Sequence, residues 1–146
     1  MAENVEYLNN AVKMYATVIV QIVIRRHVPD WMPEEAVQRK DIVPLNIKLK
    51  IRQYCERDSF QNWCEFRQNF DGKAKTKATF TPYCSCMTSI LHQQTQNDEL
   101  FFNYVVKVAE VAFYMYKNNC YDAPSIAIDY IANMLLEKYS HLLQSS

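Results

Sequence analysis

Gly72 is the only glycine among the 146 residues of this chain. Tight turns and phosphate-binding loops need glycine, because other residues rarely adopt a positive φ or let a backbone approach so closely. One glycine therefore excludes the P-loop, the dinucleotide-binding fingerprint, the kinase glycine loop and the nucleophile elbow. It also argues against a β-sandwich or barrel, which depends on many tight turns. We expect a mainly helical chain.

Length and composition are those of one globular domain spanning residues 1–146. Sixteen basic residues balance sixteen acidic ones, and 49% of the residues are hydrophobic. The N-terminus is acidic, which does not predict a signal peptide. The longest apolar stretch, residues 16–24, is too short to predict a membrane helix. Five cysteines are an odd number, so at least one is free unless it pairs between chains. We expect a reduced, intracellular protein, cytoplasmic or nuclear.

Hydrophobic spacing predicts a bundle of about five to seven helices. Between residues 4 and 27, apolar residues recur at alternating steps of three and four. Ser59 is a candidate cap for a helix ending at Phe70, a further helix is predicted over residues 82–94, and Asp122 is expected to cap the last helix. Residues 98–118 are apolar around nearly the whole circumference, which predicts a central helix or one at a subunit interface.

Two groups of residues on the last two helices carry definite expectations. The central helix is expected to have a narrow polar stripe that consists of Asn103, Lys107, Glu110 and Lys117. Four residues of the last two helices are expected to be almost completely buried: Val106, Phe113, Ile131 and Leu135. An all-helical chain with such a penultimate helix resembles Bcl-2-like proteins, whose central helix is similarly wrapped. Asn62 and Trp63 are followed by Cys64 and Glu65 instead of the Gly-Arg that this family has at its groove. The resemblance is therefore one of architecture.

Two basic segments have a different pattern. From Leu45 to Arg52, apolar and polar residues alternate strictly, which is the period of a half-buried strand. Residues 73–81 repeat this alternation more weakly. The two segments are expected either to pair as a short β-ribbon (45–52 with 73–81) or to form a helix and a solvated loop, respectively.

The middle of the chain is basic and rich in aromatic residues. From Arg39 to Lys77 there are ten basic residues and five acidic ones, a net charge of +5. Cations that contact phosphate beside aromatic rings that stack on bases are typical of single-strand binding. Segment 39–83 is therefore a candidate surface for nucleic acid or another polyanion, with these candidate residues: Lys48, Lys50, Arg52, Trp63, Arg67, Lys73, Lys75 and Lys77. The alternative is a solvated basic face with the aromatic rings in the core.

Cysteine and histidine side chains offer weak candidates for a metal site: Cys55, Cys64, Cys84, Cys86 and His92. Their spacing does not fit the knuckles of structural zinc sites, which have two to four residues between ligands. A Cys–His pair in this region lacks an orienting acid and an oxyanion-binding turn. We therefore expect no cofactor, no metal and no enzymatic activity.

The function expected from the sequence is that of a non-enzymatic helical interaction or assembly subunit. It is expected to act through protein surfaces and to self-associate, most simply as a homodimer, because its apolar helices offer more surface than a small bundle covers. The alternative is a protein that binds or coats single-stranded RNA or DNA, such as a capsid-like viral protein. Neither alternative involves membrane insertion.

Overall fold

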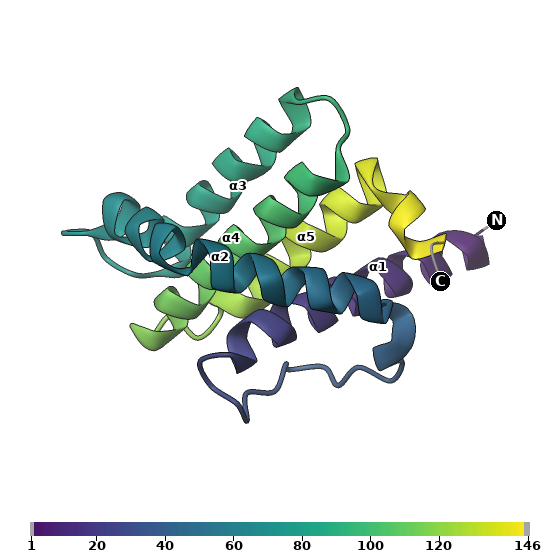
Figure 1. Cartoon of the computed structure of the whole chain (residues 1–146), viewed down its shortest axis with the longest axis horizontal. Coiled ribbons are helices and arrows are strands. Elements are labelled where there is room, and N and C mark those ends of the chain that lie inside the picture. The colour runs from purple at the N-terminus through teal and green to yellow at the C-terminus, as the bar shows by residue number, and fades with distance from the viewer. Residues whose placement is uncertain (1, 145–146) are drawn as a thin grey trace.

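The computed structural model describes residues 2–144 (Figure 1). Its five α-helices are α1 (Ala2–Arg25), α2 (Leu45–Phe70), α3 (Lys77–Gln93), α4 (Asp98–Lys117) and α5 (Ala123–Lys138). Two short 3-10 helices, η1 (Lys40–Ile42) and η2 (Ser140–Gln144), complete the described chain, which contains no strand. The helical bundle that the scarcity of glycine predicts is confirmed.

Helix α4 lies at the centre of the bundle and contacts α1, α2, α3 and α5 (Figure 1). Asn97 caps it, because its side-chain oxygen accepts hydrogen bonds from the backbone N–H groups of Glu99 and Leu100 at 2.8 and 3.3 Å. The predicted core is confirmed, since each of its four residues is buried: Val106, Phe113, Ile131 and Leu135. The predicted polar stripe is wrong at Glu110, which has no solvent exposure.

The predicted β-ribbon is wrong. Pro44 occupies the N-cap of α2, so Leu45–Arg52 begins a helix of 26 residues. The strict alternation arises from two helical faces: Ile47 and Ile51 are buried one turn apart, whereas Leu45 and Leu49 point to solvent. The second ribbon segment divides between the connection that contains Gly72 and the first turn of α3.

Two predicted helix starts lie too late in the chain. Ser59, the expected cap, lies inside α2, because no turn residue interrupts this helix before Phe70. Helix α3 begins at Lys77, five residues before the predicted start, because Thr76 and Thr79 form a capping box there. Asp122 is the N-cap of α5, as predicted, although its side chain makes no capping hydrogen bond.

Helix α1 packs along α5, α4 and α2. Its segment Val5–Arg25 is long and apolar enough to cross a membrane by length and composition. In the bundle, 61% of the most apolar part of this segment is buried. A core helix packed against other helices has the same property.

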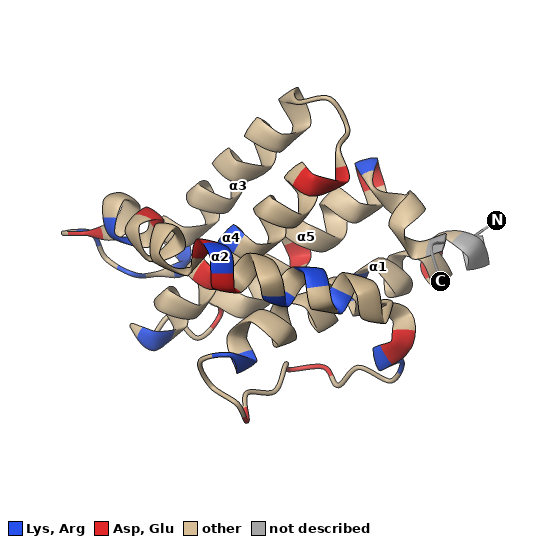
Figure 2. Cartoon of the chain, in the orientation of Figure 1, with Lys and Arg blue, Asp and Glu red and all other residues tan. Residues whose placement is uncertain are grey.

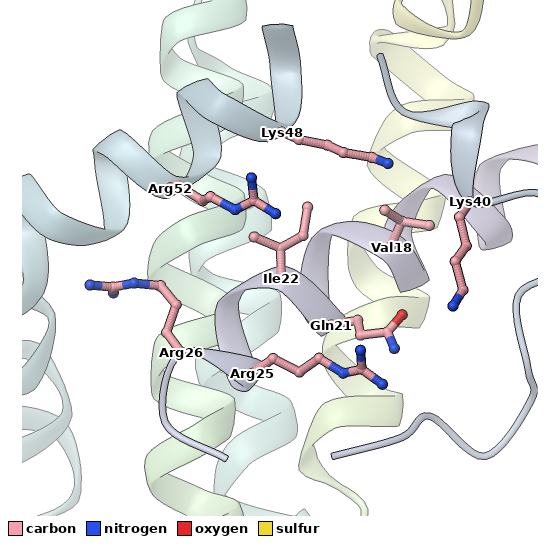
Figure 3. Close-up of a pocket in the computed structure, with 8 residues that line it drawn as sticks. All are labelled: Val18, Gln21, Ile22, Arg25, Arg26, Lys40, Lys48 and Arg52. Atoms are coloured by element: carbon pink, nitrogen blue, oxygen red, sulfur yellow. The ribbon is translucent and has the colours of Figure 1, made fainter. Parts of the chain in front are cut away.

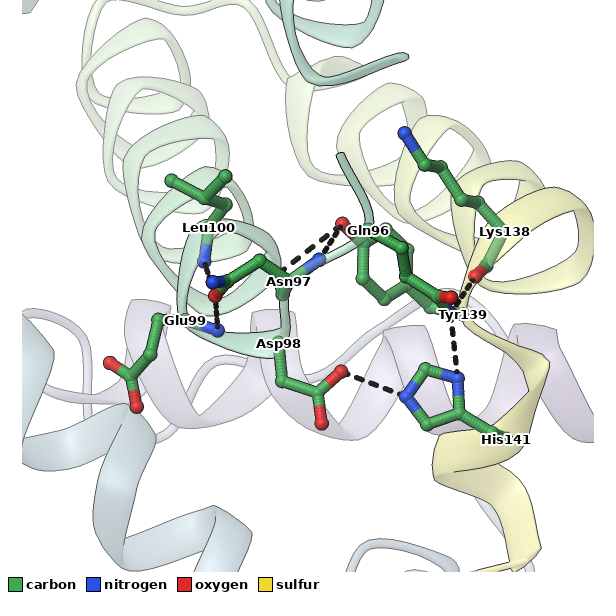
Figure 4. A network of polar contacts seen from close by, with 8 residues as sticks. All are labelled: Gln96, Asn97, Asp98, Glu99, Leu100, Lys138, Tyr139 and His141. Atoms are coloured by element: carbon green, nitrogen blue, oxygen red, sulfur yellow. Dashed lines mark hydrogen bonds and ion pairs between the residues drawn. The ribbon is translucent and has the colours of Figure 1, made fainter. Parts of the chain in front are cut away.

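Polar contacts fasten the start of α4 to the end of α5 (Figure 4). The Tyr139 hydroxyl accepts from the Asn97 N–H at 3.2 Å and donates to the Asn97 carbonyl at 3.3 Å. His141 contacts Asp98 at 2.8 Å, and Gln96 donates to the Lys138 carbonyl at 2.7 Å. The Lys138 ammonium group in turn donates to carbonyls at the end of α3, where a cation complements the helix dipole.

Candidate functional site

The outer face of α2 carries more exposed hydrophobic side chains than any other helix face in the described chain. Leu45, Leu49, Phe60 and Trp63 are four of the nine large hydrophobic side chains exposed there. At about 100° per residue they fall within an arc of roughly 60°. Burial of the opposite face, from Ile47 to Phe70, forces this one outward.

Two opposite charges, Arg52 and Glu56, lie along the helix between the two hydrophobic pairs. Glu56 falls within the arc and Arg52 about 20° outside it. Neither forms an ion pair with a described residue. The Phe60 and Trp63 rings are 6.0 Å apart. We name these six residues the α2 stripe: Leu45, Leu49, Arg52, Glu56, Phe60 and Trp63. An exposed stripe that alternates apolar pairs with unpaired charges is suited to packing against another helix.

A polar groove of about 540 Å³ lies beside the stripe, between α2 and α4. Its one large cation on α2, Arg57, pairs with Asp58 at 2.8 Å and with the Asn103 oxygen at 2.6 Å. Asn62, which also lines the groove, is 3% exposed, and its side-chain nitrogen has no hydrogen-bond partner among the described residues. The groove therefore holds one unsatisfied amide. It also holds two charged side chains, Lys107 and Glu65, that form no ion pair with a described residue.

The predicted polyanion-binding cations do not gather on one face. Lys48 and Arg52 lie near the start of α2, whereas Lys73, Lys75 and Lys77 lie beyond its other end (Figure 2). At a rise of about 1.5 Å per residue, α2 separates the two groups by roughly 33 Å. Lys50 turns toward α4, where it pairs with Glu99 at 3.2 Å.

The remaining predicted residues, Trp63 and Arg67, lie together on the outer side of α2. The Arg67 guanidinium group is 5.0 Å from the centre of the Trp63 ring and pairs with Asp71 at 2.7 Å. Phe60 is the other exposed ring of the basic segment. The other aromatic side chains that the sequence offers for base stacking are buried in the core: Tyr54, Phe66, Phe70 and Phe80.

Cysteine and histidine side chains do not converge. Among the described residues, no three His, Cys, Asp or Glu side chains come close enough to hold a metal ion. Burial, with a smaller effect from Glu110, raises the pKa of Cys55 to about 12, and burial raises the pKa of Cys84 above its ordinary value. His92 pairs with Glu137 at 2.8 Å. Both buried thiols therefore stay protonated at neutral pH.

Glu110 forms a buried charge cluster that sequence reasoning missed. One carboxylate oxygen lies 3.7 Å from the Arg26 guanidinium group, and the other lies 3.1 Å from His27 Nε2. The His27 ring stacks on Phe113 at 4.0 Å. Glu110 is the one acid in residues 105–113, which are apolar apart from Glu110 and Lys107, and this is the signal that could have identified it. This cluster joins the end of α1 to the middle of α4.

A third surface, which we name the basic pocket, lies between α1, η1 and α2 (Figure 3). It measures about 380 Å³. Cations dominate its lining, which consists of Val18, Gln21, Ile22, Arg25, Arg26, Lys40, Lys48 and Arg52.

Comparison with known protein families, curated proteins and solved structures finds no match for this chain. The chain therefore has three candidate functional surfaces: the α2 stripe, the polar groove and the basic pocket.

Proposed function

We propose that this protein is a non-enzymatic assembly subunit that forms a two-fold dimer through the α2 stripe. The observation that carries the proposal is the order of residues along the stripe. Apolar and charged residues are placed about position 54 with a symmetry that is exact for Leu45 with Trp63 and for Arg52 with Glu56, and one residue off for Leu49 with Phe60. The stripe is therefore complementary to a second copy of itself running antiparallel. A two-fold interface requires this self-complementarity.

In such a pairing, each residue type meets a suitable partner. Leu45 faces Trp63 of the second copy, and Leu49 faces its Phe60. Arg52 faces Glu56 of the second copy, which gives each of these charges the partner that it lacks among the described residues of its own chain. Two equivalent ion pairs therefore form across the two-fold axis.

Magnitudes indicate a weak dimer. Full burial of one large hydrophobic side chain contributes about 1.5–3 kcal/mol, and these eight side chains are already partly covered in the monomer. Association costs about 4 kcal/mol or more in lost translational and rotational freedom. We expect dissociation in the micromolar range, with exchange between monomer and dimer at ordinary laboratory concentrations.

Sedimentation velocity over a concentration series tests the proposal. Leu49→Ser removes one apolar contact of the stripe and is expected to shift the protein to monomer. Ile90→Ser on α3 is the matched control, since Ile90 is 47% exposed and Leu49 is 48% exposed. Circular dichroism confirms that both variants fold. A monomer at all concentrations, or equal effects of both variants, would contradict the proposal.

Charge exchange gives a sharper test of the antiparallel geometry. Arg52→Glu or Glu56→Arg alone places like charges across the axis and is expected to weaken the dimer. Combining Arg52→Glu with Glu56→Arg restores opposite charges and is expected to restore most of the affinity. Additive weakening in the double variant would rule out this pairing.

The cysteines support an intracellular setting for this assembly. All five are free in the structure. Free cysteines fit a reducing compartment, because oxidising compartments favour disulfides. The alternative function, single-strand binding, has fewer supporting observations. Within segment 39–83 only two aromatic rings are exposed, and the cations form two separated groups. Titration with an oligonucleotide distinguishes this alternative from the binding of a small phosphorylated ligand.

A further inference from the structure

We propose that the basic pocket binds a compact ligand that carries two or more clustered phosphate groups. The pocket brings together side chains that are far apart in the sequence, on α1, η1 and α2 (Figure 3). Five of its eight lining residues are cations and none is an acid. This proposal does not rest on the dimer, because Lys40 and Lys48 lie outside the α2 stripe.

Four of the five cations, Arg25 included, lack a counter-charge among the described residues. Lys40, Lys48 and Arg52 make no ion pair with any described residue. Elsewhere on α2 the cations are paired: Lys50 with Glu99, Arg57 with Asp58, and Arg67 with Asp71. Like charges held together without an anion repel each other. An anionic ligand in the pocket would relieve this repulsion.

The fourth cation, Arg25, is held in place by the chain around it. Its Nε donates to the Trp31 carbonyl at 2.9 Å, and its Nη2 lies 2.7 Å from the Met32 sulfur. With its amide oxygen turned toward Arg25, Gln21 accepts from the same guanidinium group at 2.9 and 3.2 Å. Arg26 turns the other way, where it pairs with Glu110 (Figure 3). A fixed guanidinium group loses little entropy when it binds an anion.

The start of α2 adds to the positive potential of the pocket. Lys48 lies in its first turn, which contains no acid, and the N-cap residue Pro44 provides no side-chain hydrogen bond. A helix N-terminus carries a partial positive charge equivalent to about half an elementary charge. This charge acts in the same direction as the lysine and arginine side chains.

Shape and charge together define the ligand class. A volume of about 380 Å³ is within the range of small-molecule sites. Val18 and Ile22 provide an apolar wall between the cations, which suits the carbon scaffold of a phosphorylated small molecule (Figure 3). Lys40 comes from η1, across the pocket from Lys48, so the cations surround a volume instead of following a line. This arrangement favours a compact polyphosphate over an extended strand.

Calorimetric titration of the full chain with inorganic pyrophosphate, and separately with orthophosphate, tests the proposal. We expect pyrophosphate to bind more tightly, because two phosphates engage more of the cations. Lys48→Gln and Lys40→Gln are each expected to weaken pyrophosphate binding by about tenfold, the effect of losing one charge-assisted hydrogen bond. Lys73→Gln removes the same charge at the far end of α2 and is expected to leave binding unchanged.

Two further arms identify the source of the phosphate groups. Phosphatidylcholine vesicles with and without phosphatidylinositol bisphosphate report a lipid headgroup, and binding that depends on Lys48 supports the pocket with that source. Pyrophosphate binding without vesicle binding supports a soluble ligand. Absence of binding to both pyrophosphate and the vesicles overturns the proposal. Tighter binding of a mixed-sequence oligonucleotide, weakened equally by Lys73→Gln and Lys48→Gln, also overturns it and favours the single-strand alternative.

Discussion

Replacing Arg26 with Gln should destabilise the fold more than removing the acid that Arg26 pairs with. Glu110 has no solvent exposure, whereas the side chains of Arg26 and His27 are 29% and 24% exposed. In Arg26→Gln, the Glu110 carboxylate stays buried with His27 as its remaining partner. Orphaning a fully buried charge costs about 3–5 kcal/mol. Because His27 remains and Arg26 is partly solvated, we expect about 2–3 kcal/mol.

Glu110→Gln has a different consequence. It removes the buried charge itself, and the Arg26 and His27 side chains keep access to water. We therefore expect a smaller loss of about 1 kcal/mol, the size of one lost hydrogen bond. In the double variant no charge is orphaned, so Arg26→Gln with Glu110→Gln should be more stable than Arg26→Gln alone.

Urea unfolding followed by circular dichroism measures all four corners of this cycle. For a chain of this length, about 2–3 kcal/mol corresponds to a loss of roughly 5–10 °C in Tm. The reasoning is refuted if Glu110→Gln costs as much as Arg26→Gln, or if the two effects simply add. Either result would mean that desolvation of Glu110 does not dominate this cluster.

Stability predictions for four further variants use thermal unfolding. Tyr15→Phe should raise the free energy of unfolding by up to about 1 kcal/mol, because the buried Tyr15 hydroxyl has no hydrogen-bond partner among the described residues. Tyr139→Phe breaks two hydrogen bonds to Asn97 and should lower the free energy of unfolding by about the same amount. Asn62→Leu should leave stability unchanged or raise it, since it removes an unsatisfied buried nitrogen, and a loss above about 1 kcal/mol would contradict this. Phe113→Ala should cost about 3–5 kcal/mol, because it removes a buried ring and the stacking partner of His27; a loss below about 1 kcal/mol would contradict the central position of α4.

Helices α1, α4 and α5 could be predicted, because the hydrophobic residues of each follow a single helical period. The central position of α4 follows from an apolar circumference, and its start follows from Asn97, whose side chain caps it as a polar residue before an apolar run should. Helix α2 could not be predicted over its full length. Leu45 and Leu49 are hydrophobic but exposed, so together with the buried Ile47 and Ile51 they produce the alternation that is typical of a strand. A hydrophobic residue that serves a surface misleads any argument from periodicity.

The candidate sites were harder to predict, because tertiary packing assembles them. The basic segment identified from the sequence, residues 39–77, contains Lys48 and Arg52 but not Arg25. Folding brings Arg25 into the same pocket from α1. The same segment joined Lys73 to these residues, although the length of α2 keeps them apart. Proximity in sequence is informative about charge on a segment, and only the packing of helices decides which charges share a site.

Arg52 belongs to both the α2 stripe and the basic pocket, so the two proposals make one joint prediction. A phosphate bound in the pocket competes with Glu56 of the second copy for the same guanidinium group. An exposed ion pair contributes roughly 0.5 kcal/mol, and the proposed dimer contains two of them. Losing both pairs, about 1 kcal/mol, means that saturating pyrophosphate should weaken dimerisation by about fivefold. By thermodynamic reciprocity, dimerisation must weaken pyrophosphate binding by the same factor per dimer. Sedimentation with and without pyrophosphate measures this coupling, with Lys48→Gln as the control that reduces it. If the protein dimerises and binds pyrophosphate but the two events are not coupled, Arg52 serves only one of the two surfaces. The charge-exchange variants then identify which surface it serves.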